Sequence, residues 1–253
     1  MNTTLFHRAI RKLVRPVRRA LLGKITASSI TDLTGDTLIL IAHPDDEVFC
    51  SGLICELLSR GENVHLVAFT RGEGGERIDI SSDLKLGQVR EKELREAAQE
   101  LGTTSLTFLD YVDPEISADQ ELQEPPHDSA ELLAELEALC EKLSPSQLIT
   151  HGSSGEYWHP AHLCLYRNAR NLQRRLPQLA LWTFNAWTRE HPLQAVLNQD
   201  DSPNLTLEAS AHQEQRLRAL TAHHSQREVF ERFSKGSLAD FIAMTSVENY
   251  HKW

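Results

Sequence analysis

The sequence predicts an α/β domain with a mainly parallel sheet, and three observations support this prediction. Short aliphatic runs alternate with helical stretches along most of the 253 residues. The runs are continuously apolar, which is typical of strands buried on both faces. The intervening helices are long enough to serve as right-handed crossovers between parallel strands. A hydrophobic content of 40% is enough for one large domain or two small ones.

The expected elements follow in order along the chain. Five strands are predicted, at residues 37–43, 63–70, 106–110, 147–151 and 179–187. Helices are predicted between them, at 47–61, 84–102, 129–143 and 159–176. Gly61 and Gly102 are helix-stop signals. The C-terminal part is less regular, with an added strand at 204–210 and a helix at 211–233.

Composition excludes some classes of protein. A net charge of -10 makes the body of the chain a poor candidate for binding nucleic acid. No apolar run approaches the roughly 18–20 residues that span a bilayer. The four cysteines lack the paired spacing of a zinc finger, and their apolar surroundings indicate reduced, buried thiols. These features predict a cytoplasmic chain. The sequence leaves a homo-oligomer open.

The N-terminal segment differs from the rest of the chain. Residues 1–24 contain seven basic side chains and no acid, with apolar residues at helical spacing and Pro16 as a kink. This pattern favours peripheral contact with the inner face of an anionic membrane. A helix packed on the domain and a disordered basic tail are the alternatives. The predicted organisation is a segment at 1–30 and a single domain at 31–253.

Two polar clusters follow two of the predicted strands. HPDDE (43–47) leaves the first strand, and HGSSGEYWHPAH (151–162) leaves the fourth. If these strands are neighbours, the clusters face each other at the edge of the sheet where ligands bind. Histidine and carboxylate donors favour Zn²⁺ or a similar divalent ion such as Fe²⁺. The alternative is that Asp45 or Asp46 only caps the following helix.

Other polar residues carry weaker signals. His159 and His162 are three positions apart at a helix start, so both can point toward one site. His65, His127, His191 and His251 are interpreted as ordinary residues, and Cys164 as a packing residue. GEGGE (72–76) lacks the pattern of a phosphate-binding loop, and its acids would repel phosphate.

At these motifs the sequence resembles the LmbE-like or PIG-L family of zinc-dependent de-N-acetylases. The resemblance depends on AHPDDE (42–47), TRGEGG (70–75), REKELREAAQELG (90–102), FLDY (108–111) and THGSSGEYWHPAH (150–162), and covers roughly residues 36–187. A weaker similarity continues at ALTAHHSQ (219–226). The resemblance to this family implies a Rossmann-like three-layer sandwich, the LmbE-like fold.

The resemblance also implies a role for each matched residue. The zinc ligands would be His43, Asp46 and His162. Asp45 would be the general base, while His159 and Tyr157 would polarise the acyl oxygen and stabilise the oxyanion. Arg71 and Asp110 resemble positions that contact substrate; Glu47 would support the loop.

One departure from the family pattern concerns the late motif. It usually reads H-P-D-H, whereas Ala161 replaces the acid here. The missing carboxylate would sit near His159 and raise its pKa or orient its ring.

The implied reaction is hydrolysis of the N-acetyl group of a GlcNAc-containing sugar or glycolipid, releasing acetate and a free amino sugar. Two alternatives remain open from the sequence. One is a metal-dependent amidase acting on a non-sugar conjugate, and the other is a non-catalytic carbohydrate-binding relative.

Overall fold

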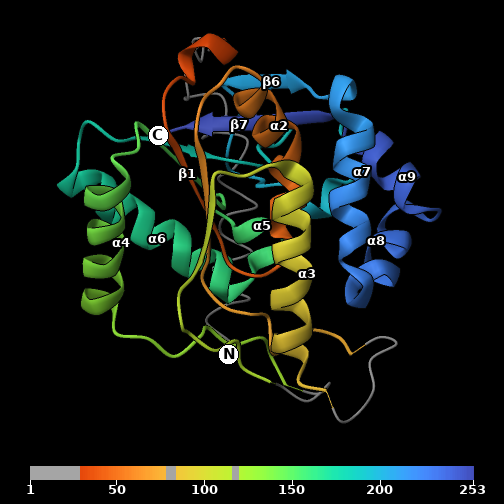
Figure 1. Ribbon diagram of the computed structural model, residues 1–253, viewed down its shortest axis with the longest axis horizontal. Coiled ribbons are helices and arrows are strands. Elements are labelled where there is room, and N and C mark those ends of the chain that lie inside the picture. The colour runs from red at the N-terminus through yellow and green to blue at the C-terminus, as the bar shows by residue number, and fades with distance from the viewer. Residues whose placement is uncertain (1–28, 78–83, 116–119) are drawn as a thin grey trace.

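The computed structural model describes residues 29–77, 84–115 and 120–253, and their sheet lies between two layers of helices (Figure 1). Its seven strands have the order β3-β2-β1-β4-β5-β7-β6. The strands are β1 (Thr37–Ile41), β2 (Val64–Ala68), β3 (Ser105–Phe108), β4 (Gln147–Thr150), β5 (Ala180–Thr183), β6 (Leu205–Glu208) and β7 (Val247–Lys252). The α-helices are α2 (Ser51–Ser59), α3 (Leu86–Leu101), α4 (Ser129–Leu143), α5 (Gly155–Trp158), α6 (Pro160–Arg175), α7 (Gln213–Ala222), α8 (Arg227–Ser234) and α9 (Leu238–Met244).

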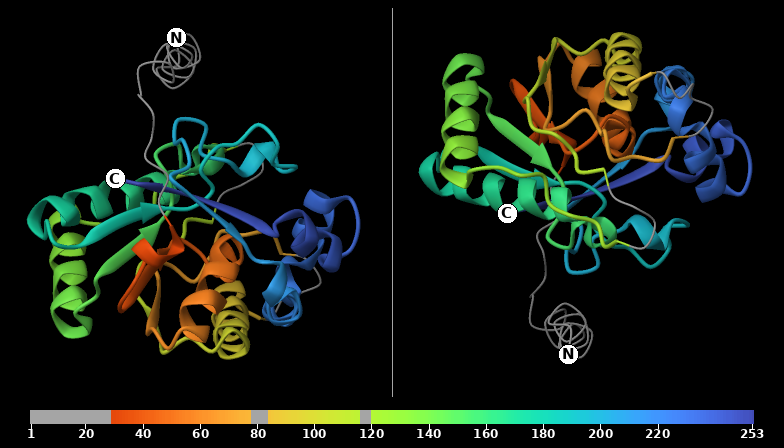
Figure 2. Two further views of the ribbon diagram at one scale, coloured as in Figure 1. Left: turned by 90° about the horizontal axis from the view of Figure 1, so that it is seen from above. Right: turned by 90° about the horizontal axis from the view of Figure 1, so that it is seen from below.

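The first five strands are parallel, as predicted. β1 pairs with β2 on one side and with β4 on the other, so the two strands that precede the polar clusters are neighbours. β7 runs antiparallel to both β5 and β6, and the sheet is therefore mainly rather than wholly parallel. The expected α/β class and three-layer arrangement are confirmed (Figure 2).

Alternate residues of β1 enter the two apolar layers. Ile39 and Ile41 pack with residues of α2, α3 and α7. Leu38 and Leu40 pack with residues of α4 and α6 on the opposite face. All five residues of β1 are buried, which explains why this strand reads as a continuous apolar run.

Some element boundaries differ from the prediction. The helix expected at 47–61 begins as a 3₁₀ turn, η2 (Asp46–Cys50), before α2. The helical character expected at 211–233 is confirmed, but it is divided: α7 ends at Ala222, a 3₁₀ turn, η5 (His224–Gln226), follows, and α8 then begins. β7 and α9 were not predicted. The sequence of β7 is polar, and this strand is formed by pairing with β5 on one side and with β6 on the other.

The C-terminal helices cover the end of the sheet that carries the polar clusters. Phe230 of α8 and Phe241 of α9 share an apolar cluster with Val48 of η2. No helix in the described ranges is long and apolar enough to cross a membrane. The basic helix predicted within 1–24 lies outside the described residues.

Candidate active site

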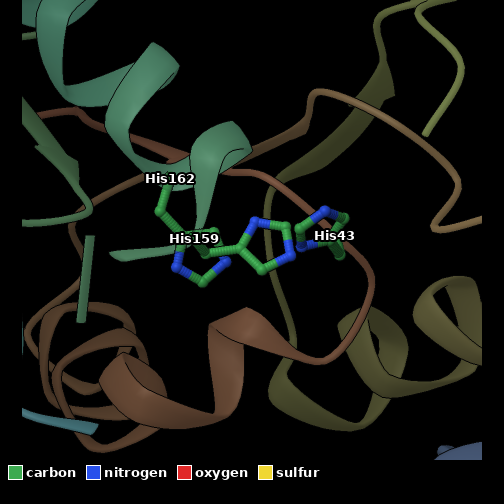
Figure 3. Close-up of side chains that lie close together, drawn as sticks. All are labelled: His43, His159 and His162. Atoms are coloured by element: carbon green, nitrogen blue, oxygen red, sulfur yellow. The ribbon is translucent and has the colours of Figure 1, made fainter. Parts of the chain in front are cut away.

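The carboxyl ends of β1 and β4 bring the two polar clusters together, as their adjacency requires. Figure 3 shows His43, His159 and His162 side by side. The ring centroid of His159 lies 4.7 Å from that of His43 and 4.5 Å from that of His162. His159 precedes Pro160, the first residue of α6, and His162 follows in the first turn. The prediction that both point toward one site is confirmed.

Three residues at this site have backbone conformations that side chains disfavour. Their φ angles are positive: 103° at Asp45, 58° at Glu156 and 71° at Trp158. Such conformations cost on the order of 1–3 kcal/mol each and persist where surrounding contacts impose them. Asp45 makes no side-chain capping bond to η2. The alternative in which it is only a helix cap is therefore not observed.

Asp46 links two of the proposed metal ligands. Its Oδ2 lies 3.4 Å from Nδ1 of His43, and its Oδ1 lies 3.5 Å from Nε2 of His162. Tetrahedral zinc with ligand bonds of roughly 2.0–2.2 Å would separate neighbouring nitrogen and oxygen donors by about 3.4 Å. These two contacts join His43, Asp46 and His162, named below the His162 cluster. The groups whose donor atoms all lie within 4.8 Å of one another are His43, His159 and His162, and Asp46, His151 and His162.

Glu156 orients His162 toward that position. Its Oε2 lies 2.5 Å from Nδ1 of His162, while Nε2 of His162 is buried and has no hydrogen-bond partner. A carboxylate behind a ligating imidazole is typical of metal sites, because it fixes the ring and its tautomer.

His151 also lies beside Asp46, but both of its ring nitrogens are engaged. Nε2 accepts a hydrogen bond from the backbone N–H of Ala42 at 3.0 Å. Nδ1 lies 3.1 Å from Glu156. A metal ion at Nε2 would displace the Ala42 bond, although Nε2 also lies 3.5 Å from Oδ2 of Asp46 and His151 forms a candidate donor group with Asp46 and His162.

The pKa values at this site indicate a need for positive charge. Burial lowers the pKa of His43, but Asp113 and Asp46 outweigh it and raise the value to about 10. Asp113 and Asp46 therefore favour the protonated form of His43 when no cation is bound. A divalent ion would replace that proton.

Asp45 is placed to act on a proton. One of its oxygens lies 3.0 Å from the buried guanidinium of Arg90, which also donates a hydrogen bond to the carbonyl of Gly72. Burial raises the pKa of Asp45 to about 6, although Arg90 opposes the shift. A carboxylate with this pKa is a suitable general base near neutral pH.

His159 lacks a carboxylate partner. Burial, together with His162 and His43, lowers its pKa, so the ring stays neutral. Its buried Nδ1 has no hydrogen-bond partner. Ala161 is fully buried in the apolar cluster between the sheet, α4 and α6. His159 is therefore a neutral imidazole, and the effect of the absent acid on it stays a prediction.

Arg71 and Asp110 pair with each other away from the histidines. Their nearest charged atoms are 3.0 Å apart, and Arg71 also contacts Glu91 of α3. Neither residue lines the hollows described next. Their contact with substrate stays a prediction.

Two hollows meet at Asp45, Asp46 and Tyr157. The larger has a volume of about 240 Å³ and a polar lining that includes His43, His159, Arg90 and Asp113. The smaller has a volume of about 90 Å³ and is lined mainly by apolar side chains, namely Phe49, Phe184, Val196, Val229, Phe230 and Phe233.

Sequence reasoning assigned no role to four supporting residues. The sequence feature that could have indicated a role for Glu156 is its position within GSSGEYW, between two histidines. His223 lies in ALTAHHSQ; it contacts Glu47 at 2.6 Å, and Glu47 in turn accepts a hydrogen bond from the Asp45 backbone N–H. Glu47 thus supports the loop. Arg90 is the first residue of REKELREAAQELG (90–102), one of the motifs that carry the resemblance, whereas Asp113 has no local sequence signal.

Comparisons with known proteins agree with this geometry. The family model described as PIG-L, GlcNAc-PI de-N-acetylase, matches residues 38–172. The 1D-myo-inositol 2-acetamido-2-deoxy-alpha-D-glucopyranoside deacetylase of Mycolicibacterium vanbaalenii is 27% identical over 249 residues, covering 83% of this chain and 87% of that protein.

Two solved structures share the fold. N,N'-diacetylchitobiose deacetylase from Pyrococcus horikoshii has a TM-score of 0.58 at 21% identity and covers 98% of this chain and 92% of its own. The hydratase GalB from Pseudomonas putida has a TM-score of 0.61 at 18% identity, with coverages of 87% and 96%. Because a hydratase and a deacetylase share it, the fold alone does not define the reaction.

Proposed function

The chain belongs to the PIG-L family, and on that premise we propose that it hydrolyses the N-acetyl group of a GlcNAc conjugate. The single observation that carries this proposal is the position of Asp45 beside the His162 cluster, at the junction of a polar and an apolar hollow. The Mycolicibacterium relative is named for a 2-acetamido sugar on inositol. A sugar conjugate of this kind is therefore the proposed substrate.

The cation and the base divide the work of amide hydrolysis. Zn²⁺ bound by His43, Asp46 and His162 would lower the pKa of a water molecule and polarise the acyl carbonyl. Asp45 takes a proton from the attacking water and returns it to the leaving amine. Arg90 holds the Asp45 carboxylate in place during both transfers.

Two further side chains act on the acyl oxygen. His159 is neutral and donates a hydrogen bond as negative charge develops there, which favours polarisation over full protonation. Tyr157, half-exposed at the mouth of both hollows, donates its phenolic O–H to the same oxygen.

The two hollows suit different parts of the substrate. The polar hollow suits the sugar hydroxyls, and the apolar hollow suits the methyl of the acetyl group. An engineered cavity of about 150 Å³ binds benzene, so one of about 90 Å³ suits only a short acyl group. We expect acyl release to fall from acetyl to butanoyl to hexanoyl. Phe233→Ala should relax this order by enlarging the hollow, whereas Leu143→Ala, which alters the apolar cluster around α4 and α6, should not.

The decisive test is an acid-release assay on metal-supplemented protein. The panel contains N-acetylglucosamine, its inositol-linked conjugate and chitobiose, against N-acetyl amino acids and peptides. Acetate release from the sugars at a higher kcat/KM supports the proposal. A preference for the non-sugar amides, or no release from any compound, would overturn it.

Three finer parts of the proposal need separate measurements. Elemental analysis of purified protein distinguishes Zn²⁺ from Fe²⁺. Sedimentation distinguishes a monomer from a homo-oligomer. The proposed membrane contact of residues 1–24 is wrong if deleting them leaves binding to anionic liposomes unchanged.

A further inference from the structure

A second cluster of metal-ligating side chains lies outside the active site. Glu124, His127 and Cys164, named below the Cys164 cluster, place one donor atom each within 4.8 Å of one another. Cys164 is on α6, two residues after His162. A rotation of about 200° separates the two residues around the helix axis, so their side chains point to different faces.

The donor spacing matches a tetrahedral zinc site. Sγ of Cys164 lies 3.5 Å from Nε2 of His127, and Oε1 of Glu124 lies 3.6 Å from the same nitrogen. Bonds of about 2.3 Å to sulfur and 2.0–2.2 Å to nitrogen and oxygen would separate neighbouring donors by about 3.4–3.6 Å. The three atoms therefore need little movement to close around one ion.

Neighbouring groups hold these donors in a suitable orientation. Nδ1 of His127 lies 2.9 Å from the carbonyl of Pro125 and donates to it, which leaves Nε2 with a lone pair directed at the cluster. Arg167 engages Oε2 of Glu124 at 2.5 Å and leaves Oε1 free to ligate. Outer contacts of this type accompany ligating imidazoles and carboxylates in metal sites.

The site has both burial and a route to solvent. Cys164 is fully buried, the His127 side chain is 9% exposed and that of Glu124 is 33% exposed. Oγ of Ser129 lies 3.2 Å from Nε2 of His127 and donates a hydrogen bond to it, which an ion at Nε2 would displace. An ion can therefore enter past Glu124 and reach a thiol that is otherwise enclosed.

We propose that Glu124, His127 and Cys164 bind a second zinc ion, which has a structural role. The thiol releases its proton to solvent as the sulfur–zinc bond forms, and the combination of thiolate, imidazole and carboxylate suits Zn²⁺. The ion ties residues 120–127 to α6. Leu122 and Gln123 of that segment line the polar hollow, so the second ion stabilises one wall of the substrate site.

The test measures metal content and thiolate ligation in the full chain rather than activity. Metal-free protein is titrated with Zn²⁺ and, separately, with Co²⁺, whose bond to a thiolate gives a charge-transfer band in the near ultraviolet. The His162 cluster has no sulfur and cannot produce this band. Cys164→Ala is the test variant. Cys140→Ala, which removes another buried thiol on α4 with no such neighbours, is the matched control.

We expect two metal ions per chain in the parent and the Cys140 variant, and one in Cys164→Ala. The cobalt band should be present in the first two proteins and absent from the third. His127→Gln, which alters a loop residue, provides the same comparison if Cys164→Ala does not fold. A parent without the band, or a Cys164 or His127 variant that keeps it, overturns the proposal: the three side chains would then form only a hydrogen-bonded cluster. Neither result depends on whether a sugar is deacetylated.

Discussion

The His162 and Cys164 clusters use the same helix for different purposes. Donors of the His162 cluster open onto two hollows and lie beside a carboxylate with a raised pKa. The Cys164 cluster contains a thiol and is packed against the loop that precedes α4. A catalytic metal site keeps a position open for water or substrate, whereas a structural site is closed by protein donors. The surroundings of the donors, more than the types of donor atom, distinguish the proposed catalytic site from the proposed structural site.

The largest expected effect comes from removing the base without touching any ligand. Asp45→Asn should reduce kcat by roughly 10²–10⁴-fold, because general base catalysis contributes this much. Its metal content should equal that of the parent. Asp36→Asn, which alters an exposed carboxylate bonded to Asn63, is the control and should retain parent activity. An Asp45 variant as fast as the parent would contradict the proposed role.

A reciprocal pair of variants separates the two clusters. Glu156→Gln weakens the support behind His162 and should lower metal affinity there by roughly 10–100-fold. Glu124→Gln should lower affinity only at the Cys164 cluster. Metal titration of both variants, monitored by the cobalt band and by activity, checks this assignment. If each variant affected both sites equally, the two clusters would not be independent.

Arg90 should control the pH dependence of the reaction. A base acts in its deprotonated form, so activity rises with pH through the pKa of Asp45. Arg90 favours the charged carboxylate, and Arg90→Met should therefore raise that pKa and move the acid limb of kcat/KM to higher pH. Arg95→Met, on the exposed side of α3, should leave the limb in place. An unshifted or lower limb in the Arg90 variant would be inconsistent with this ion pair.

The smallest expected effect concerns the residue that follows His127. Asp128 caps α4 by accepting hydrogen bonds from the backbone N–H groups of Ala130 and Glu131, which lower its pKa. Because the folded pKa is depressed, the stabilisation is complete above the ordinary aspartate value of about 3.9 and is lost as pH falls through the folded value. Asp128→Ala should lower Tm at neutral pH, and the difference should shrink on acidification. Asp128→Asn retains a capping side chain and should remain closer to the parent at neutral pH. If the difference in Tm between Asp128→Ala and the parent did not change with pH, the stabilisation would not come from the ionised carboxylate.

Local patterns were sufficient for the parallel half of the fold. The apolar runs at 37–43 and 63–70 predicted buried strands, which the structure has at 37–41 and 64–68. Gly61 and Gly102 marked helix ends where the structure has φ angles of 80° and 83°. β7 could not be predicted in this way. It is polar, and its hydrogen bonds to β5 and β6 stabilise it as a strand.

The sequence by itself determined the α/β class and the two motifs whose side chains meet at the carboxyl ends of β1 and β4. The α/β class follows from alternating strands and helices, and the resemblance carried by HPDDE and HPAH implied the donors and the base. That β1 and β4 are neighbours was a condition which the structure met. Only the tertiary structure decided that His151 lies beside Asp46 and Glu156, that Arg90 and Glu156 contact Asp45 and His162, and that His127 lies beside Cys164. These contacts join residues on separate elements, and a linear pattern carries no record of which side chains share a space once the layers have packed.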